Sequence, residues 1–268
     1  MEVFMKIAKI LSLLFVLALI IGTMASCGAE ELTAKQIVDN AAVEMEKTPY
    51  RVSIDLDFST SNETYKEIVS AMSLKGIEMD VDGKNLHFGI DMDMGIATMQ
   101  AEYTAVDGTV YVNATTSSLD STQSVKRKAV LNEDQLTEFL ADLNLSNDMN
   151  VEDFISTTVA KDGDTYTIAC EGMTDKLNEA LSEMIGSAAS GISGAPTISD
   201  VSYVVNVKNN KIESAKLSCT YKVTVSDEEI DFTMNFDMVY DYDASVSITT
   251  PSDAATYTEV DYDELMGA

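Results

Sequence analysis

Several residue types are scarce in this chain of 268 residues, which contains no Trp, one His, three Cys and three Pro. A single histidine, His87, excludes most Ser-His-Asp, Cys-His and His-ligated zinc chemistry. Basic residues are also few, since 17 Lys and Arg face 45 Asp and Glu, and the net charge is −28. The phosphate backbone of a nucleic acid would be repelled by such a surface. We therefore expect a protein that is not an enzyme, needs no cofactor and binds no nucleic acid.

Apolar residues, in contrast, are plentiful. They make up 46% of the chain, and Gly is limited to 13 residues. This composition is typical of a folded protein rather than a disordered or low-complexity one. The length allows one or two domains. We expect a single domain because the alternating strands described below share one pattern.

The N-terminus has the features of an export signal. Lys6 and Lys9 precede an apolar run at 10–21, which is short for a membrane span, and small residues follow it. The sequence Ala-Ser-Cys-Gly around Cys27 resembles the bacterial lipobox, with Met24 where Leu is more usual. In that family the signal is cut before the cysteine, whose sulfur then carries a diacylglycerol. An ordinary secretory signal with an incidental cysteine is the alternative.

The lipobox reading predicts a lipid anchor at Cys27 on the extracytoplasmic face of the cell membrane. Two acyl chains would hold the protein there stably. It also divides the chain into a signal peptide (1–26), a lipidated tether (27–32), a folded domain (33–258) and an acidic tail (259–268). We expect the domain to be a monomer.

The folded domain begins with a predicted helix. Thr33 and Gln36 form the capping-box pattern, Ile37, Val38, Ala41, Ala42 and Met45 make one apolar stripe, and Pro49 ends the helix.

Alternating apolar and polar residues then predict antiparallel strands with one dry face. The alternation is clear at 50–58, 86–94, 99–105, 217–225 and 230–240. Tight-turn pairs stand at 82–83, 107–108, 162–163 and 209–210. Helical spacing is predicted at 63–74, from Asn132 to Leu143, near Phe154 and at 174–186, and 187–196 is a small-residue loop. The predicted fold is therefore α+β, with a single long curved antiparallel sheet (a half-open barrel) and helices over its apolar concave face.

This order of elements, ending in Val-Ser-Ile-Thr-Thr-Pro-Ser-Asp at 246–253, resembles the half-open β-barrel lipoproteins. These include the LolA/LolB carriers and the LppX/LprG group, and the chain is most similar to uncharacterised Gram-positive members. The resemblance covers most of 31–253. It implies an apolar cavity under helices that holds acyl chains, and it transfers no catalytic motif.

The inward faces of the predicted strands are rich in Met and aromatic residues, which suit an apolar site that adapts to variable chains. The predicted cavity lining is Phe88, Met92, Met94, Met99, Tyr221, Phe232, Met234, Phe236 and Met238. A hydrophobic small molecule or lipid is then the expected ligand. A filled core would use the same residues. In that case the protein would be a cell-surface scaffold that binds a protein partner, whose identity the sequence does not indicate.

Polar clusters give weaker signals. His87 is predicted to be exposed on the polar face of its strand. Asp80-Val-Asp82-Gly83 is similar to the start of a calcium-binding loop, but Gly89 stands where such a loop needs Glu, so we predict a hairpin turn. The acidic clusters at 241–243 and 261–264 predict solvated segments, and we expect no metal site.

The basic run 126–128 and two cysteines leave alternatives open. The run either guards a strand edge, which we favour, or meets an anionic group. Cys170 and Cys219 both have apolar-face parity. They either form a disulfide, which export permits, or stay as buried thiols.

Overall fold

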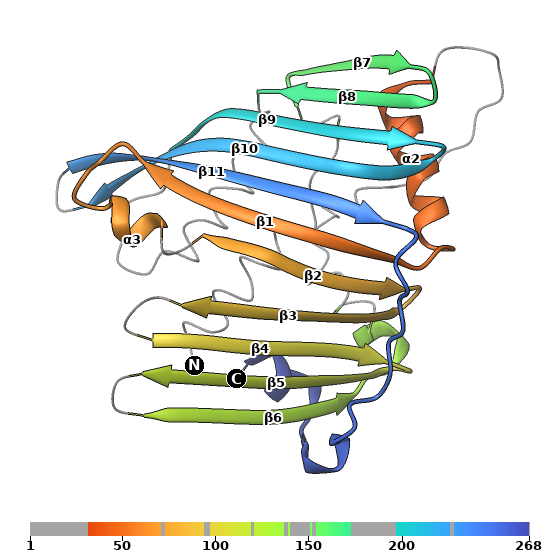
Figure 1. Ribbon diagram of the computed structural model, residues 1–268, viewed down its shortest axis with the longest axis vertical. Coiled ribbons are helices and arrows are strands. Elements are labelled where there is room, and N and C mark those ends of the chain that lie inside the picture. Colours follow the sequence, from red (N-terminus) through yellow and green to blue (C-terminus); the bar gives the residue numbers. More distant parts are fainter. Residues whose placement is uncertain are drawn as a thin grey trace.

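The computed structural model describes residues 32–70, 73–93, 97–118, 121–136, 139, 151, 154–172, 197–225 and 228–267. Several predicted features lie outside these residues: the signal peptide, Cys27, Met94, most of the helix after Asn132, the helix at 174–186 and the loop at 187–196. The structure is that of an α+β protein built on one large, curved and unclosed sheet of 12 strands (Figure 1).

The sheet is made of two meanders joined along one seam. Six strands form the first meander: β1 (Tyr50–Thr60), β2 (Leu74–Asp82), β3 (Asn85–Asp93), β4 (Ala97–Val106), β5 (Thr109–Ser118) and β6 (Thr122–Val130). Five form the second: β7 (Ser156–Asp162), β8 (Thr165–Glu171), β9 (Thr197–Lys208), β10 (Lys211–Val225) and β11 (Glu228–Asp241). The spatial order is β12-β6-β5-β4-β3-β2-β1-β11-β10-β9-β8-β7, so the first and last long strands of the chain pair with each other at the centre.

All these long strands pair antiparallel, as the alternation predicted. Two hairpin turns have both loop residues at positive φ: Asp107 (51°) with Gly108 (75°), and Asn209 (51°) with Asn210 (57°). That backbone geometry matches the right-handed twist of the flanking strands, and Asn, Asp and Gly adopt it at low cost. The turn pairs read from the sequence therefore fix the hairpin registers.

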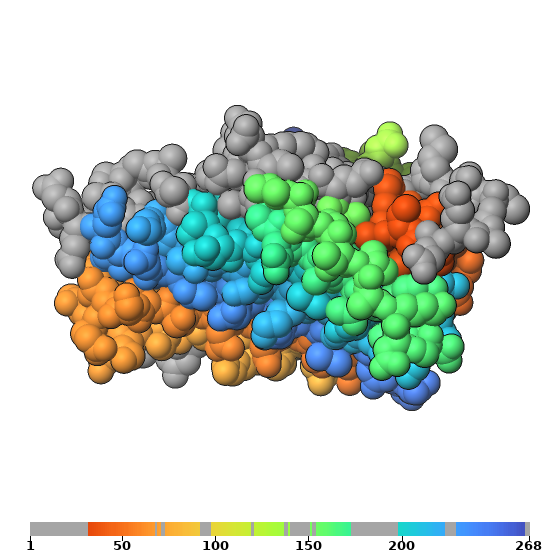
Figure 2. All heavy atoms as spheres, turned by 90° about the horizontal axis from the view of Figure 1, so that it is seen from above, coloured from red at the N-terminus to blue at the C-terminus, as the bar shows by residue number. Residues whose placement is uncertain are grey.

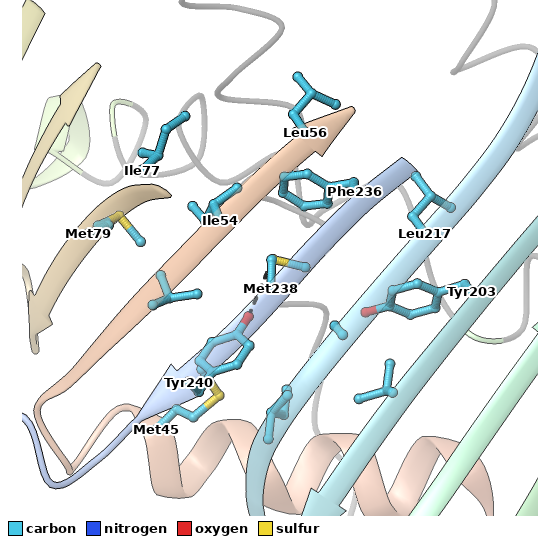
Figure 3. Close-up of a cluster of buried hydrophobic side chains, with 14 of the residues drawn as sticks. Met45, Ile54, Leu56, Ile77, Met79, Tyr203, Leu217, Phe236, Met238 and Tyr240 are labelled. Atoms are coloured by element: carbon cyan, nitrogen blue, oxygen red, sulfur yellow. Dashed lines mark hydrogen bonds between the residues drawn. The ribbon is translucent and has the colours of Figure 1, made fainter. Parts of the chain in front are cut away.

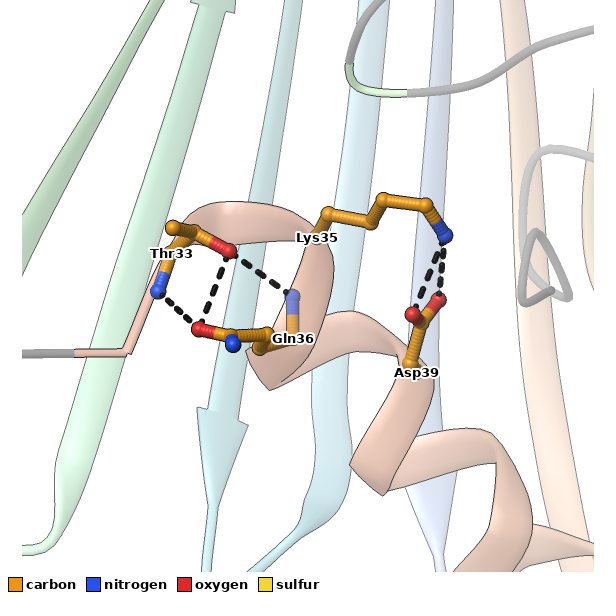
Figure 4. Close-up of polar contacts among 4 residues, drawn as sticks. All are labelled: Thr33, Lys35, Gln36 and Asp39. Carbon is orange, nitrogen blue, oxygen red and sulfur yellow. Dashed lines mark hydrogen bonds and ion pairs between the residues drawn. The ribbon is translucent and has the colours of Figure 1, made fainter. Parts of the chain in front are cut away.

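Helix α2 (Ala34–Met45) begins at the predicted cap. The Thr33 side chain accepts a hydrogen bond from the Gln36 amide (3.3 Å), and the Gln36 side chain accepts one from the Thr33 amide (2.9 Å), as Figure 4 shows. In the first turn, Lys35 pairs with Asp39, four residues further along the helix (3.0 Å). The apolar stripe of the helix packs against β7, β9 and β10, and Figure 2 shows the helix beside the β7–β8 hairpin.

The helix predicted at 63–74 is confirmed at Lys66–Ser70 and wrong at Leu74. Helix α3 spans only Lys66–Ser70, and strand β2 begins at Leu74. Leu74 pairs with Leu56 of β1, and the Ser73 hydroxyl accepts a hydrogen bond from the Phe58 amide (2.9 Å). Apolar spacing in this short stretch fits either structure, and pairing with β1 decides it.

The C-terminal segment lies against the sheet rather than apart from it. It leaves β11, passes the ends of the first-meander strands in Figure 1, and contains a 3-10 turn (η3, Ala254–Thr256), a short strand β12 (Thr258–Glu259) and helix α6 (Tyr262–Gly267). β12 pairs parallel with β6, and the Val260 amide donates to the carbonyl of Lys128 (2.9 Å). Of the segment expected to be an acidic tail (259–268), Glu259 thus belongs to β12 at the β6 edge of the sheet, and helix α6 contacts β6.

Candidate functional site

The predicted apolar face centres on the seam between β1, β11 and β10. Phe236 of β11 lies between Leu56 on one side and Leu217 on the other, and all three side chains are at most 1% exposed (Figure 3). Met234 and Met238, two positions away along β11, point to the same face, with Met238 opposite Ile54 of β1. The seam therefore joins strands more than 150 residues apart into one apolar surface.

Tyr221 and Phe232 extend this surface at one end of the seam. They are register partners on β10 and β11, and their rings stack with centroids 5.4 Å apart. Tyr221 is buried, whereas Phe232 is partly buried against the core. Five of the predicted lining residues thus meet on two neighbouring strands.

Three other predicted lining residues, Phe88, Met92 and Met99, lie on β3 and β4, and Met94 lies outside the described residues. Phe88 stacks on Tyr103 with centroids 4.6 Å apart, and Met99 is buried opposite Met92 in the register. This group lies about 14 Å from β11, since β1 and β2 intervene at about 4.8 Å per strand. The two groups belong to one continuous buried cluster, in which Met79 of β2 lies between them.

Three tyrosines that the sequence analysis missed as lining residues cluster at the α2 end of this face, since the ring centroids of Tyr50, Tyr240 and Tyr242 lie 5.7–6.5 Å apart. A fourth, Tyr203 of β9, lies opposite Leu217 of β10 and stacks on Phe154 with centroids 5.9 Å apart. Tyr50 and Tyr240 stand at apolar positions of the alternating runs 50–58 and 230–240, so the sequence pattern could have predicted that they face inward.

Burial sets the electrostatics of the inner face. It raises the pKa of the Cys219 thiol to about 12 and raises the pKa values of Tyr50, Tyr203 and Tyr240 above their ordinary value of 10. Desolvation disfavours the charged form of each group. Among the described residues, the buried side chains are all apolar or uncharged, with Thr104 the one polar residue other than tyrosine and cysteine. Such a surface is suited to apolar groups.

The two cysteines are free and buried. Cys170 lies on β8 and Cys219 on β10, and β9 separates them, with Tyr203 paired opposite Cys170. Two strand spacings, about 10 Å, exceed the Cα separation of about 7 Å that a disulfide spans. Of the two alternatives that the sequence left open, the structure therefore shows the free thiols.

The polar candidates Asp80 and His87 contact other side chains of the same chain. No group of three or more ligand-type side chains gathers anywhere in the described ranges. Asp80, part of the sequence that resembles a calcium loop, accepts two hydrogen bonds from Arg51 (2.6 and 3.0 Å) instead. His87 is exposed on the outer face, as predicted, and its Nδ1 lies 2.9 Å from the Thr104 hydroxyl.

The basic run lies on β6, where each of its side chains pairs with the C-terminal segment. Lys126 pairs with Asp253, Arg127 with Glu264 (3.8 Å) and Lys128 with Glu259 (3.8 Å). The run thus lies near one edge of the sheet, where β12 pairs with β6 at Arg127 and Lys128 and acidic residues of the same chain neutralise it. Its guarding of a strand edge stays a prediction.

Comparisons with known proteins give no family. No protein-family model matches the chain, and no curated protein matches it. Among solved structures, the ywiB protein from Bacillus subtilis is similar over 72% of this chain and 92% of its own, at 7% identity and a TM-score of 0.19. The dehydratase domain from the CurF module of Curacin polyketide synthase covers 88% and 100%, at 9% identity and a TM-score of 0.14.

Scores this low carry no argument about fold or function, and neither structure is a LolA/LolB or LppX/LprG protein. No helix in the described part of the chain is long and apolar enough to cross a bilayer.

Proposed function

We propose that this chain is a lipoprotein, anchored in the cell membrane through Cys27 and facing out of the cytoplasm, that binds a hydrophobic ligand such as a lipid. The ligand would lie against the inner face of the sheet, and no covalent chemistry would be involved. The observation that carries the proposal is the continuous apolar inner face, which runs from β4 through the β1–β11 seam to β8 on a sheet that does not close.

The kinds of side chain on this face support a ligand that varies in shape. Met79, Met99, Met234 and Met238 are spread over three strands, β2 and β4 of the first meander and β11 of the second. Methionine side chains are flexible and polarizable, so they adapt to chains of different length and branching. An acyl chain would gain about 0.8 kcal/mol per methylene transferred from water to such a surface.

A filled core is the competing arrangement, and it has an observation in its favour. Met234, Phe236 and Met238 are at most 4% exposed, as the side chains of a packed interior are. The protein would then be a surface scaffold whose acidic outer face meets a protein partner.

Two measurements separate these functions. Lipids extracted from the purified protein are identified by mass spectrometry, and a fluorescent fatty acid is titrated into the delipidated protein. A carrier is expected to yield co-purified lipid and to bind the fatty acid with saturation and displacement by unlabelled oleate. A protein without extractable lipid and without saturable binding would be the scaffold.

The variant Met234→Trp sharpens the test. In a site with room for a ligand, the indole takes the place of the ligand and abolishes binding while the melting temperature is kept. In a filled core it overpacks the interior and costs about 1–3 kcal/mol. Val239→Trp is the matched control, because Val239 lies on the outer face of the same strand and is 58% exposed.

The anchor is tested separately with Cys27→Ser. The variant is expected to leave the membrane fraction for the medium, or to remain unprocessed, because serine offers no thiol for the diacylglycerol. Normal processing and unchanged membrane association would contradict the lipoprotein assignment while leaving the ligand-binding test intact.

A further inference from the structure

A pocket of about 410 Å³ lies on the outer face of the sheet, opposite the apolar surface. Its floor is the polar side of β3, β4 and β5, and its roof is the C-terminal segment that follows β11. The lining comprises His87, Glu102, Thr104, Asn113, Ser247, Ile248, Thr249, Pro251, Ser252, Asp253 and Tyr257. This volume falls within the range of about 300–1,000 Å³ that small-molecule sites occupy.

The floor consists of two cross-strand pairs. His87 of β3 lies opposite Thr104 of β4, with 2.9 Å between Nδ1 and Oγ1, and Glu102 of β4 accepts a hydrogen bond from Asn113 of β5 (3.2 Å). Thr104 is only 6% exposed. Opposite Glu102, the register places Gly89, which leaves the space beside the carboxylate free of a side chain.

The roof is held in place by packing and by charge. Tyr257 is 8% exposed and meets Tyr111 of β5 edge to face, with ring centroids 5.4 Å apart. Asp253 pairs with Lys126 of β6, whose ammonium also lies 5.6 Å from the centre of the Tyr257 ring. The pocket therefore has a fixed wall formed by residues that are remote in the sequence.

The charges of the pocket are nearly balanced. Lys126 neutralises Asp253, and the hydrogen bond between them is the main cause that raises the pKa of Lys126, to which the Glu102 carboxylate adds a smaller part. Glu102 also accepts a hydrogen bond from Asn113. An anionic ligand would meet two carboxylates, and a cationic one would meet the ammonium. Hydroxyl, amide and carboxylate groups dominate the remainder of the lining, with Ile248 and Pro251 as its aliphatic members.

We propose that this pocket binds a neutral polyhydroxylated molecule of the size of a mono- or disaccharide. Each sugar hydroxyl both donates and accepts a hydrogen bond, which matches a lining of hydroxyls, one amide and two carboxylates. Glu102 accepts from sugar hydroxyls, Asn113 and the hydroxyls of the roof donate and accept, and Tyr257 supplies an apolar wall for a ring face. The site is independent of the lipid-binding proposal, because it uses the opposite face of the sheet.

The test uses the full-length chain, purified in a detergent without a sugar headgroup, and saturation-transfer NMR. The neutral probes are glucose, galactose, N-acetylglucosamine, maltose, cellobiose and chitobiose, with glucosamine and glucuronate as charged analogues. At least one neutral sugar is expected to bind with saturation below about 10 mM, the range of a few hydrogen bonds. Preference for a disaccharide would indicate a glycan chain as the source, and preference for a monosaccharide a free sugar.

Three variants locate the binding. Glu102→Ala and Asn113→Ala are expected to weaken it by about tenfold, the loss of one charge-assisted or shared hydrogen bond. Ser247→Trp, at an exposed roof position, fills the pocket and should abolish binding. Glu229→Ala, an exposed carboxylate on β11, is the matched control and should change nothing.

Melting temperatures equal to that of the wild type show that each variant is folded. Absence of saturable binding by every neutral sugar overturns the proposal, as does binding confined to glucosamine or glucuronate. Binding that persists unchanged in Ser247→Trp and Glu102→Ala would also overturn it.

Discussion

The two faces of the sheet are held by different forces, and β11 shows the difference residue by residue. Met234, Phe236 and Met238 point inward and are at most 4% exposed. Between them, Asn235 accepts a hydrogen bond from Ser218 (2.8 Å), and Asp237 pairs with Lys216 (2.9 Å) at positions that solvent reaches. Neighbouring residues of one strand thus belong to an apolar core and to a network of exposed polar contacts.

The two faces therefore contribute differently to the stability of the whole domain and to the local order of the C-terminal segment. Apolar burial contributes about 1.5–3 kcal/mol per large side chain, whereas an exposed ion pair contributes at most about 1 kcal/mol. The inner face therefore controls global unfolding. The outer face, with its ion pairs along β6, controls how the C-terminal segment lies on the sheet.

Phe236→Ala is expected to have the largest effect. Phe236 is fully buried between Leu56 and Leu217, so truncation should lower the free energy of unfolding by about 3–5 kcal/mol. Urea denaturation followed by circular dichroism measures it. Asn235→Ala, the adjacent outer position, should cost about 1 kcal/mol or less. Equal losses for the two variants would contradict the division between faces.

Alkaline pH should weaken the inner face selectively. Burial raises the pKa of Tyr240 well above its ordinary value of 10, so above pH 10 the unfolded chain loses this proton while the folded chain keeps it. Stability is then fully present below pH 10 and falls above it, by about 1.4 kcal/mol per pH unit for each such tyrosine.

Tyr240→Phe isolates one tyrosine of this set. Its stability should fall less steeply above pH 10 than that of the wild type, while remaining similar at pH 7. Urea denaturation at a series of pH values measures the two slopes. Parallel curves for the two proteins would show that Tyr240 does not titrate differently in the folded and unfolded chains.

The cap of α2 tests the stability of the helix that packs against β7, β9 and β10. Thr33→Ala removes the side-chain acceptor of the Gln36 amide and should cost about 1 kcal/mol. Thr33→Ser keeps the acceptor and should restore most of this loss. The midpoint of urea denaturation distinguishes them, and a serine variant as unstable as the alanine variant would argue against the capping interaction.

The smallest effect is expected on the outer face, at Asp253. Lys126 lowers the pKa of this carboxyl below its ordinary value of 3.8, so the interaction is complete above that pH and is lost as pH falls through the lower folded value. Asp253→Asn should lower hydrogen-exchange protection of amides in 254–260 at pH 6 without a change in global stability. Asp243→Asn, an exposed carboxylate near β11, is the control.

Much of the fold could be read from local patterns. The capping box at Thr33, the alternation of 86–93 and 230–240 and the turn residues at 107–108 and 209–210 all appear in the structure at their predicted places. Each of these features depends on residues close together in the sequence: the cap on its hydrogen bonds, the strands on the alternation of side chains between two faces, and the turns on residues that adopt positive φ. For the same reason the sequence indicated which face of each strand is apolar.

Contacts between distant segments were decided only by the tertiary structure. The seam that joins β1 to β11, the separation of Cys170 from Cys219 by β9, the change from helix to strand at Leu74 and the pairing of residues 126–128 with the C-terminal segment all follow from strand order. Strand order is fixed by how the whole chain buries its apolar faces together. A period-2 pattern gives each strand its inner face but carries no information about which strand lies next to it.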